Sequence, residues 1–280
     1  METARLILDP AADGAWNMSV DQALLETANS TGLISLRFYT WSEPTLSLGY
    51  FQSHVDRRLH PPSLDCQLVR RRTGGGAILH DDELTYSLCV PSENRWSKKN
   101  GELYRLVHQC IVQLLDEMGI ESHLYGDLKK KTKPLVDSSS SSNQRLEKVK
   151  PNELEKHPNA YSAPTVDQNS FMCFERRSDG DIVIKEYKVV GSAQRRIKQS
   201  LLQHGSILQK RSRFAPGLSG ILDLSNFYLN REELSKLLAA KVFKCLRVQA
   251  FEGTLKASEV EAAKKAHSLQ FNSEQWNHQR

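Results

Sequence analysis

The sequence contains no apolar run that approaches the roughly 20 residues of a membrane-spanning helix. Its first ten residues, METARLILDP, carry an acidic second residue and no long apolar core. A secretory signal is therefore not expected, and neither is a membrane partner.

Cysteine is scarce and scattered. The five cysteines form no CxxC pair; they are Cys66, Cys89, Cys110, Cys173 and Cys245. An odd number of unclustered cysteines argues against a disulfide framework and against a structural zinc site. We therefore predict a reducing, cytoplasmic setting and no metal site. Cys66, Cys89, Cys110 and Cys245 are interpreted as packing residues.

The sequence also lacks a recognisable nucleic-acid-binding motif, because its basic residues are not interleaved with aromatic ones. Its net charge of +5 is compatible with acidic protein partners but diagnostic of none. With 280 residues, 39% hydrophobic and 25% charged, it has an ordinary globular composition. The length suits one large domain, or one domain with a small appendage. The sequence does not indicate the oligomeric state, and we expect a monomer by default.

Hydrophobic periodicity predicts helices over residues 17–28 and 101–118, the second ending at Gly119. In the first, Ser19 and Gln22 have capping-box spacing. Strands are expected over 36–41, 45–48 and 84–90, the last with its even-numbered residues on one face. Residues 171–177 and 181–185 suggest a hairpin that turns at Asp179-Gly180.

The composition changes abruptly over residues 129–168, where lysines and a run of five serines lead into a polar, proline-containing stretch. We expect a disordered insertion there. A strand starts near Lys188, helical spacing follows Asn230, and a last helix is expected from Ser258, with Glu261 at capping-box spacing. This order predicts an α+β (mixed α/β) fold with a central mixed, largely antiparallel sheet flanked by helices.

The most informative stretch is RRRTGGGAILHDDELTYS, residues 70–87. Three consecutive glycines lie between two strand-like segments, and glycine lets the backbone approach a ligand closely because it has no Cβ. The preceding arginines favour an anionic or carbonyl-bearing ligand. A glycine-rich hairpin corner without a ligand is the alternative interpretation.

This run resembles the glycine loop of the biotin/lipoate protein ligase family. Three further blocks are similar to that family in the same order: 17–26, then 37–52, and then KVVGSAQRR with LQHGSIL over 188–208. The resemblance spans roughly residues 15–210. It implies the class II synthetase-like catalytic domain of that family, which we place at 1–225, with a short helical carboxyl-terminal extension at 226–280. About seventy residues follow Leu208, fewer than the accessory domain of many ligases of this family.

Within the family, the segment Met172-Cys173-Phe174-Glu175 resembles the cysteine-dependent octanoyltransferases, which hold octanoate as a thioester. The expected hairpin places Cys173 opposite position 186, close to Lys188. A lysine ammonium there would favour the thiolate and stabilise an oxyanion on the acyl carbonyl. We therefore predict Cys173 as nucleophile and Lys188 as its catalytic partner. The alternative interpretation is that Cys173 is a buried, inert thiol and Lys188 a surface lysine.

The resemblance also implies which residues surround the substrate. We expect the acyl slot to be lined by Gly74, Gly75 and Gly76 on one side and by Gly191, Ser192 and Ala193 on the other. Four neighbours of these glycines and one motif arginine complete the predicted substrate-binding set: Ala77, His80, His204, Gly205 and Arg71. His80 is equally compatible with a structural role at the end of a strand, and His204 is expected to support rather than to catalyse.

The predicted reaction takes octanoate from octanoyl-acyl carrier protein, holds it on Cys173 and passes it to a lysine of a lipoyl domain. The acceptors implied are the glycine cleavage H protein and 2-oxoacid dehydrogenase subunits, and no cofactor is required. Transfer between two lipoyl domains, instead of from acyl carrier protein, remains open, and so do two other functions. One is a lipoate ligase that uses ATP and magnesium, and the other is a non-catalytic lipoyl-domain binder in which Cys173 is incidental.

Overall fold

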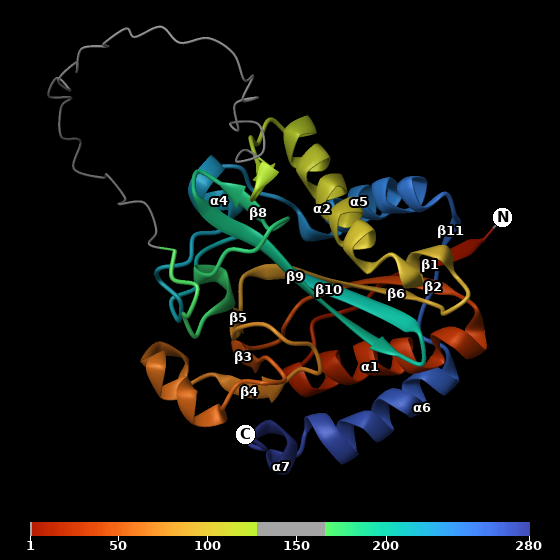
Figure 1. Ribbon diagram of the computed structural model, residues 1–280, viewed down its shortest axis with the longest axis horizontal. Coiled ribbons are helices and arrows are strands. Elements are labelled where there is room, and N and C mark those ends of the chain that lie inside the picture. The colour runs from red at the N-terminus through yellow and green to blue at the C-terminus, as the bar shows by residue number, and fades with distance from the viewer. Residues whose placement is uncertain (1, 128–165) are drawn as a thin grey trace, which may run out of the picture.

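The computed structural model describes residues 2–127 and 166–280 (Figure 1). The insertion expected at 129–168 therefore lies almost wholly outside the described residues. Within those ranges, no helix combines the length and apolarity required to span a membrane.

A mixed sheet forms the centre of the described structure, with the strand order β11-β1-β2-β6-β10-β9-β8-β7. The pairs β11-β1 and β1-β2 are parallel, and the other pairs are antiparallel. The predicted α+β fold with a largely antiparallel sheet is thereby confirmed. In chain order its strands are β1 (Thr3–Leu8), β2 (Ile34–Tyr39), β6 (Glu83–Val90), β7 (His123–Leu124), β8 (Ile182–Ile184), β9 (Tyr187–Ile197), β10 (Ser200–Leu208) and β11 (Gln249–Glu252).

Helices cover both faces of this sheet (Figure 1). One face packs against α2 (Asn100–Glu117) and α5 (Arg231–Leu246), which contact each other. The other face packs against α1 (Gly14–Thr31), which in turn contacts α6 (Ala257–Ala266). Alternation along β6 divides its side chains between the two layers, because successive residues of a strand point to opposite faces.

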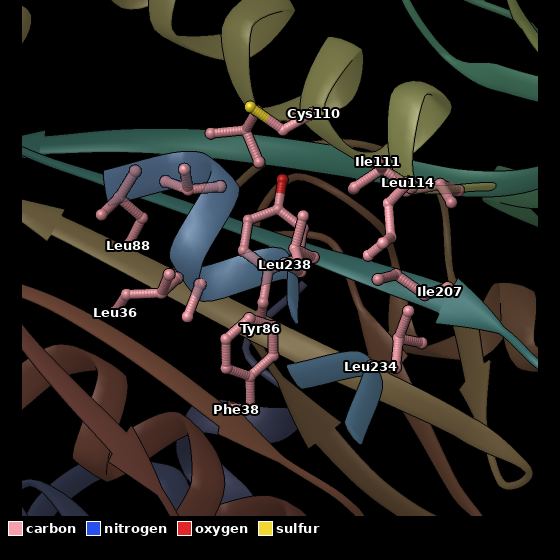
Figure 2. Close-up of a cluster of buried hydrophobic side chains, with 14 of the residues drawn as sticks. Leu36, Phe38, Tyr86, Leu88, Cys110, Ile111, Leu114, Ile207, Leu234 and Leu238 are labelled. Carbon is pink, nitrogen blue, oxygen red and sulfur yellow. The ribbon is translucent and has the colours of Figure 1, made fainter. Parts of the chain in front are cut away.

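Figure 2 shows the larger core, where side chains of β2 and β6 point towards α2 and α5. Leu84, Tyr86, Leu88 and Val90 all belong to it, as the alternating pattern predicts. Cys89, on the opposite face of β6, packs instead under α1. Cys110 lies in the apolar stripe of α2 and is 1% exposed, so its expected packing role is confirmed.

A second, smaller sheet carries the glycine loop. Its order is β4-β3-β5, with β3 (Thr45–Leu48), β4 (Gln67–Arg70) and β5 (Ile78–His80), and the glycines join β4 to β5. The short helices η1 (His54–Leu59) and η2 (Pro61–Ser63) fill the connection from β3 to β4. Residues 36–41 and 45–48 were both expected as strands, and they belong to two different sheets.

Two predicted helix caps are wrong. The α1 helix begins earlier than expected, at an N-cap formed by Asp13, whose carboxylate accepts from Trp16 N; Ser19 lies within the helix and donates to Ala15 O. The α6 helix begins at Ala257, and Glu259 accepts from Lys256 N. Gly119 has a φ of +76° just after α2, the left-handed conformation expected of a glycine cap.

The hairpin expected from Phe171 to Lys185 is also wrong. Cys173 begins a 3-10 turn, η4 (Cys173–Glu175), and the hairpin is formed instead by β8 and β9. Its two turn residues, Lys185 and Glu186, have φ of +45° and +69°. Positive φ at both central residues is the type I′ pattern, which matches the twist of the flanking strands. The chain still turns at Asp179-Gly180, where Asp181 N donates to Ser178 O at 3.0 Å, but no strand precedes that turn.

Residues beyond 225 are not purely helical. After α5, strand β11 adds to the free edge of β1, and α6, η5 (His267–Phe271) and α7 (Glu274–Asn277) then follow α1 to the small sheet. Asn277 accepts a hydrogen bond from the backbone of Arg70 at 2.8 Å. The carboxyl-terminal segment thus braces the strand that leads into the glycine loop. The remaining short helices are η3 (Arg95–Lys98) and α4 (Ile221–Ser225).

Candidate active site

A narrow cavity of about 50 Å³ lies where α1, the glycine loop and strands β9 and β10 meet. Ten residues predicted from the sequence line it: Arg71, Gly74, Gly75, His80, Cys173, Gly191, Ser192, Ala193, His204 and Gly205. The sequence reasoning did not include six further lining residues: Met18, Tyr39, Trp41, Ile78, Thr85 and Ser206.

Cys173 lines this cavity, and Lys188 lies beside Cys173 without lining the cavity itself. The ammonium Nζ of Lys188 lies 3.6 Å from Cys173 Sγ and donates to the carbonyl of the same residue at 3.4 Å. Lys188 also forms an ion pair with Asp181 at 2.8 Å. The pair was expected across a hairpin, but it forms because the 3-10 turn at Cys173 lies against the start of β9.

The charge of Lys188 is held in place by its surroundings. Burial by itself lowers the pKa of Lys188, but Cys173 and Asp181 more than offset this, and the net pKa is raised. The side chain is therefore a fixed cation, although its residue is only 5% exposed. Tyr104 donates to the second oxygen of Asp181 at 3.0 Å, which fixes the carboxylate that faces the lysine.

The glycine loop positions the cysteine by direct backbone contact. Ala77 N donates to Phe171 O at 2.9 Å, and Cys173 N donates to Ala77 O at 2.7 Å. A Cβ at Gly76 would lie 2.9 Å from Cys173 N, so only glycine fits there. Gly76 and Ala77 were predicted to contact substrate, but they do not line the cavity; they pack behind Cys173.

Arg71 supports the loop from within. Its guanidinium donates to the carbonyls of Gly74 at 3.0 Å and Gly76 at 2.7 Å, and also to Ser47. Burial lowers the pKa of Arg71 to about 10, and the nearby Cys173 partly offsets that effect. The side chain thus remains cationic at neutral pH and adds a second positive charge beside the cysteine.

Two histidines line the cavity, each joined to a buried carboxylate. His80 Nδ1 bonds with Glu83 at 2.8 Å, and its Nε2 bonds with Ser47 Oγ at 2.7 Å. His204 Nδ1 bonds with Asp21 at 3.1 Å, and its Nε2 bonds with Thr73 Oγ1 at 2.8 Å. The carboxylates fix the proton on Nδ1 in each ring, so both Nε2 atoms accept from hydroxyls.

Trp41 and Arg37 complete these two networks. The indole of Trp41 stacks on His80 with ring centroids 3.8 Å apart and donates to Thr85 at 2.9 Å. Arg37 is fully buried and pairs with Asp21 at 2.9 Å. Burial would raise the pKa of Asp21, but the His204 hydrogen bond and the Arg37 charge lower it overall.

Ser192 is held by a third histidine that the sequence reasoning missed. His108, on α2, bonds through Nε2 with Ser192 Oγ at 2.6 Å and through Nδ1 with Gly180 O at 2.6 Å. Since a carbonyl only accepts, Nδ1 carries the proton and Nε2 accepts from the serine hydroxyl. Burial lowers the pKa of His108 to about 4, so the ring is neutral at physiological pH. The sequence feature that indicates His108 is a histidine next to the apolar stripe of α2.

The other cysteines differ in their surroundings. Cys66 and Cys89 are buried, as expected, but Cys245 is exposed, so its predicted packing role is wrong. Its sulfur lies 3.6 Å from that of Cys110 at the α2–α5 contact. Among the residues that the structure describes, no group of three acidic, histidine or cysteine side chains has the arrangement of a metal site.

Comparison with known proteins decides the family. The family described as "Lipoyl protein ligase A/B catalytic domain" matches residues 13–213, which contain the whole cavity. The chain belongs to this family. Two relatives called Octanoyltransferase LipM match over essentially their full lengths. The relative from Halalkalibacterium halodurans is 31% identical and covered to 99%, with 99% of this chain aligned; the one from Kyrpidia tusciae is 30% identical, with both chains fully covered.

Solved structures agree on the fold. Lipoate-protein ligase A bound with ATP superposes with a TM-score of 0.68 at 19% identity, over 99% of both chains. The bi-partite lipoate protein ligase from Thermoplasma acidophilum gives 0.67 at 18% identity, covering 99% of this chain and 97% of that one. The family fold is thus present, with Cys173 on its cavity and Lys188 beside that cysteine.

Proposed function

We propose that this lipoyl ligase family member is an octanoyltransferase that works through a thioester on Cys173. The single observation that carries this proposal is the position of Cys173 Sγ at the cavity, 3.6 Å from the ammonium of Lys188. A ligase that makes an acyl-adenylate needs no such nucleophile, because the adenylate is already reactive. Both full-length relatives are named octanoyltransferases, which supports octanoyl transfer rather than ligation.

In the first half-reaction, the Cys173 thiolate attacks the carbonyl carbon of octanoyl-acyl carrier protein. A new carbon–sulfur bond forms, and negative charge develops on the carbonyl oxygen. The Lys188 ammonium stabilises the thiolate before attack and the oxyanion after it. Collapse of the intermediate breaks the bond to the carrier's sulfur, which leaves as a thiolate and takes a proton from solvent.

In the second half-reaction, the amine of a lipoyl-domain lysine attacks the acyl-enzyme. An amide bond forms, the bond to Cys173 Sγ breaks, and the amine's excess proton passes to the departing sulfur or to water. An amide is more stable than a thioester, so this step drives the sequence forward. Division into two steps lets donor and acceptor proteins dock in turn at one cavity.

The surrounding residues orient the acyl group in this scheme. The octanoyl chain lies against Gly74 and Gly75 in this scheme, while His80 and His204 shape the polar wall of the slot. Gly191 leaves room for Lys188, because a Cβ there would lie 2.5 Å from the lysine Cε. The reaction needs neither ATP nor a metal ion. We place the reaction in the cytoplasm.

The proposal is tested by intact mass after incubation with octanoyl-acyl carrier protein. We expect an octanoyl adduct on the wild type that disappears in Cys173→Ala. Cys245→Ala is the matched control, because it removes the exposed thiol and should keep the adduct. A lipoyl domain should then discharge the adduct. Acylation that requires ATP and free octanoate would instead indicate a ligase, and no product in either assay would leave only a binding function.

A further inference from the structure

Three arginines gather on aromatic rings beside the cavity. The guanidiniums of Arg280 and Arg195 lie 5.0 and 5.7 Å from the ring centroid of Tyr50. That of Arg72 lies 5.6 Å from the centroid of Trp276, whose ring is 5.9 Å from Tyr50. Stacking on aromatic faces holds the cations in fixed directions. These three residues are called the arginine cluster below.

No member of the arginine cluster forms a salt bridge within the described residues; the Glu26 carboxylate acts on Arg72 only from beyond ion-pair distance. The Nε atoms of Arg72 and Arg195 are buried and have no hydrogen-bond acceptor within the described residues. Burial and the charge of Arg195 lower the pKa of Arg72, and the charges of Glu26 and Tyr50 offset this only in part. Like charges placed together with two Nε donors unpaired cost free energy, which a bound anion would offset.

The cluster adjoins the acyl cavity on two sides. Arg72 directly follows Arg71, which lines the cavity. Arg195 lies two residues after Ala193 on the same face of β9, a separation of roughly 7 Å along a strand. The two segments are joined, because Arg195 Nη1 donates to Arg72 O at 2.8 Å.

We propose that the arginine cluster binds the phosphate group of the phosphopantetheine arm through which an acyl carrier protein presents its thioester. This inference rests on the proposed function. The arm is otherwise uncharged, so its phosphate diester is the one group on it that a guanidinium recognises through paired, charge-assisted hydrogen bonds. A lipoyl-domain lysine carries no phosphate, and the cluster therefore distinguishes donor from acceptor at a shared entrance.

Two small donors that differ only in the phosphate isolate this contact: octanoyl-phosphopantetheine and octanoyl-pantetheine. With the wild type, we expect kcat/KM for Cys173 acylation to be about tenfold higher for the phosphorylated donor, the size of one charge-assisted hydrogen bond. In Arg72→Gln the ratio should fall towards one. This substitution is the safest to fold, since the Arg72 guanidinium donates no hydrogen bond recorded in the described residues.

Arg196→Gln is the matched control, because it removes the same charge one residue along β9, on the opposite face, where Arg196 bonds with Asn100. Its donor ratio should equal that of the wild type. Equal kcat/KM for the two donors in the wild type would overturn the inference. A second result would also overturn it: the wild type acylates only with ATP and free octanoate, and Arg72→Gln loses that activity. The arginine cluster would then bind the phosphates of a nucleotide.

A failure of the proposed function gives a different result. In that case neither donor acylates wild-type Cys173, and no ratio exists to compare. If both donors acylate it at the same rate, the thioester mechanism stands and only the assignment of the arginine cluster is wrong.

Discussion

The ammonium of Lys188 lies 3.6 Å from the sulfur of Cys173, although the two residues are not cross-strand partners. Cys173 lies in η4, and Lys188 pairs with Val183 in the β8–β9 hairpin. Cys173 is held by the glycine loop, and Lys188 by its ion pair with Asp181 at 2.8 Å. Each partner is thus fixed from behind by a different part of the fold. Four predictions follow from this arrangement and its supports.

Removal of the Lys188 charge should slow acylation of Cys173 by about 100-fold, the usual cost of losing one oxyanion donor. Lys188→Met tests this by single-turnover mass spectrometry with octanoyl-acyl carrier protein. Lys188→Arg should retain more activity than Lys188→Met, since it keeps the charge. The exposed Lys210→Met is the control and should react like the wild type. Equal rates in Lys188→Met and Lys210→Met would contradict the role.

A methyl group at Gly76 should displace the nucleophile. Its Cβ would meet Cys173 N at 2.9 Å and Phe171 O at 3.0 Å, both of them backbone atoms that cannot rotate away. We expect Gly76→Ala to fold but to acylate Cys173 roughly 10- to 100-fold more slowly, because small misplacements of a reacting group are costly.

Gly101→Ala provides the comparison for Gly76→Ala. A Cβ at Gly101, in the first turn of α2, would meet no atom within 4 Å. This variant should acylate normally and gain about 0.5 kcal/mol in the free energy of unfolding, as alanine restricts the unfolded chain. Normal acylation by Gly76→Ala would show that the glycine loop does not position Cys173.

His108 should make the fold sensitive to acid. Its pKa is lowered to about 4 by burial, whereas an unfolded histidine titrates near 6.5. The unfolded state therefore binds the extra proton first, and stability falls as the pH drops from about 6.5 towards 4. At pH 5 the loss from this residue amounts to about 2 kcal/mol relative to pH 7.

Urea unfolding at pH 7 and pH 5 measures this contribution. His108→Gln should lose about 2 kcal/mol less than the wild type over that interval, since glutamine does not titrate. Identical pH dependence in the wild type and His108→Gln would falsify the assignment of a neutral ring.

Asp21 should be far more important for stability than a surface carboxylate. It is 2% exposed and accepts from Arg37, Tyr39 and His204. Asp21→Asn leaves the buried Arg37 without its full countercharge, and we expect a loss of about 3 kcal/mol. Glu102→Gln removes a carboxylate from an exposed pair with Lys99 and should cost under about 0.5 kcal/mol. Urea midpoints compare the two, and a similar cost for both would contradict the interpretation.

Local patterns in the sequence determined much of the fold. The apolar stripe of α2 and the alternation of β6 are properties of a few consecutive residues, and both elements lie where those patterns predict. The glycine run likewise identified a wall of the cavity, because glycine, which has no Cβ, lets the backbone come close to a ligand. Cys173 and Lys188 were paired correctly, although through a hairpin that does not exist.

Only the tertiary structure decided the partners of the buried polar groups. Glu259, which accepts from Lys256 N at the start of α6, also pairs with Arg5 at 2.6 Å, across 254 residues of sequence. His108 bonds with Ser192 across 84 residues, and His204 with Asp21 across 183. A buried charge or ring nitrogen must find a partner wherever the folded chain brings one, and no local spacing encodes that choice. Hydrophobic periodicity therefore determines where helices and strands form. The need of buried polar groups for partners determines which residues of those elements contact one another.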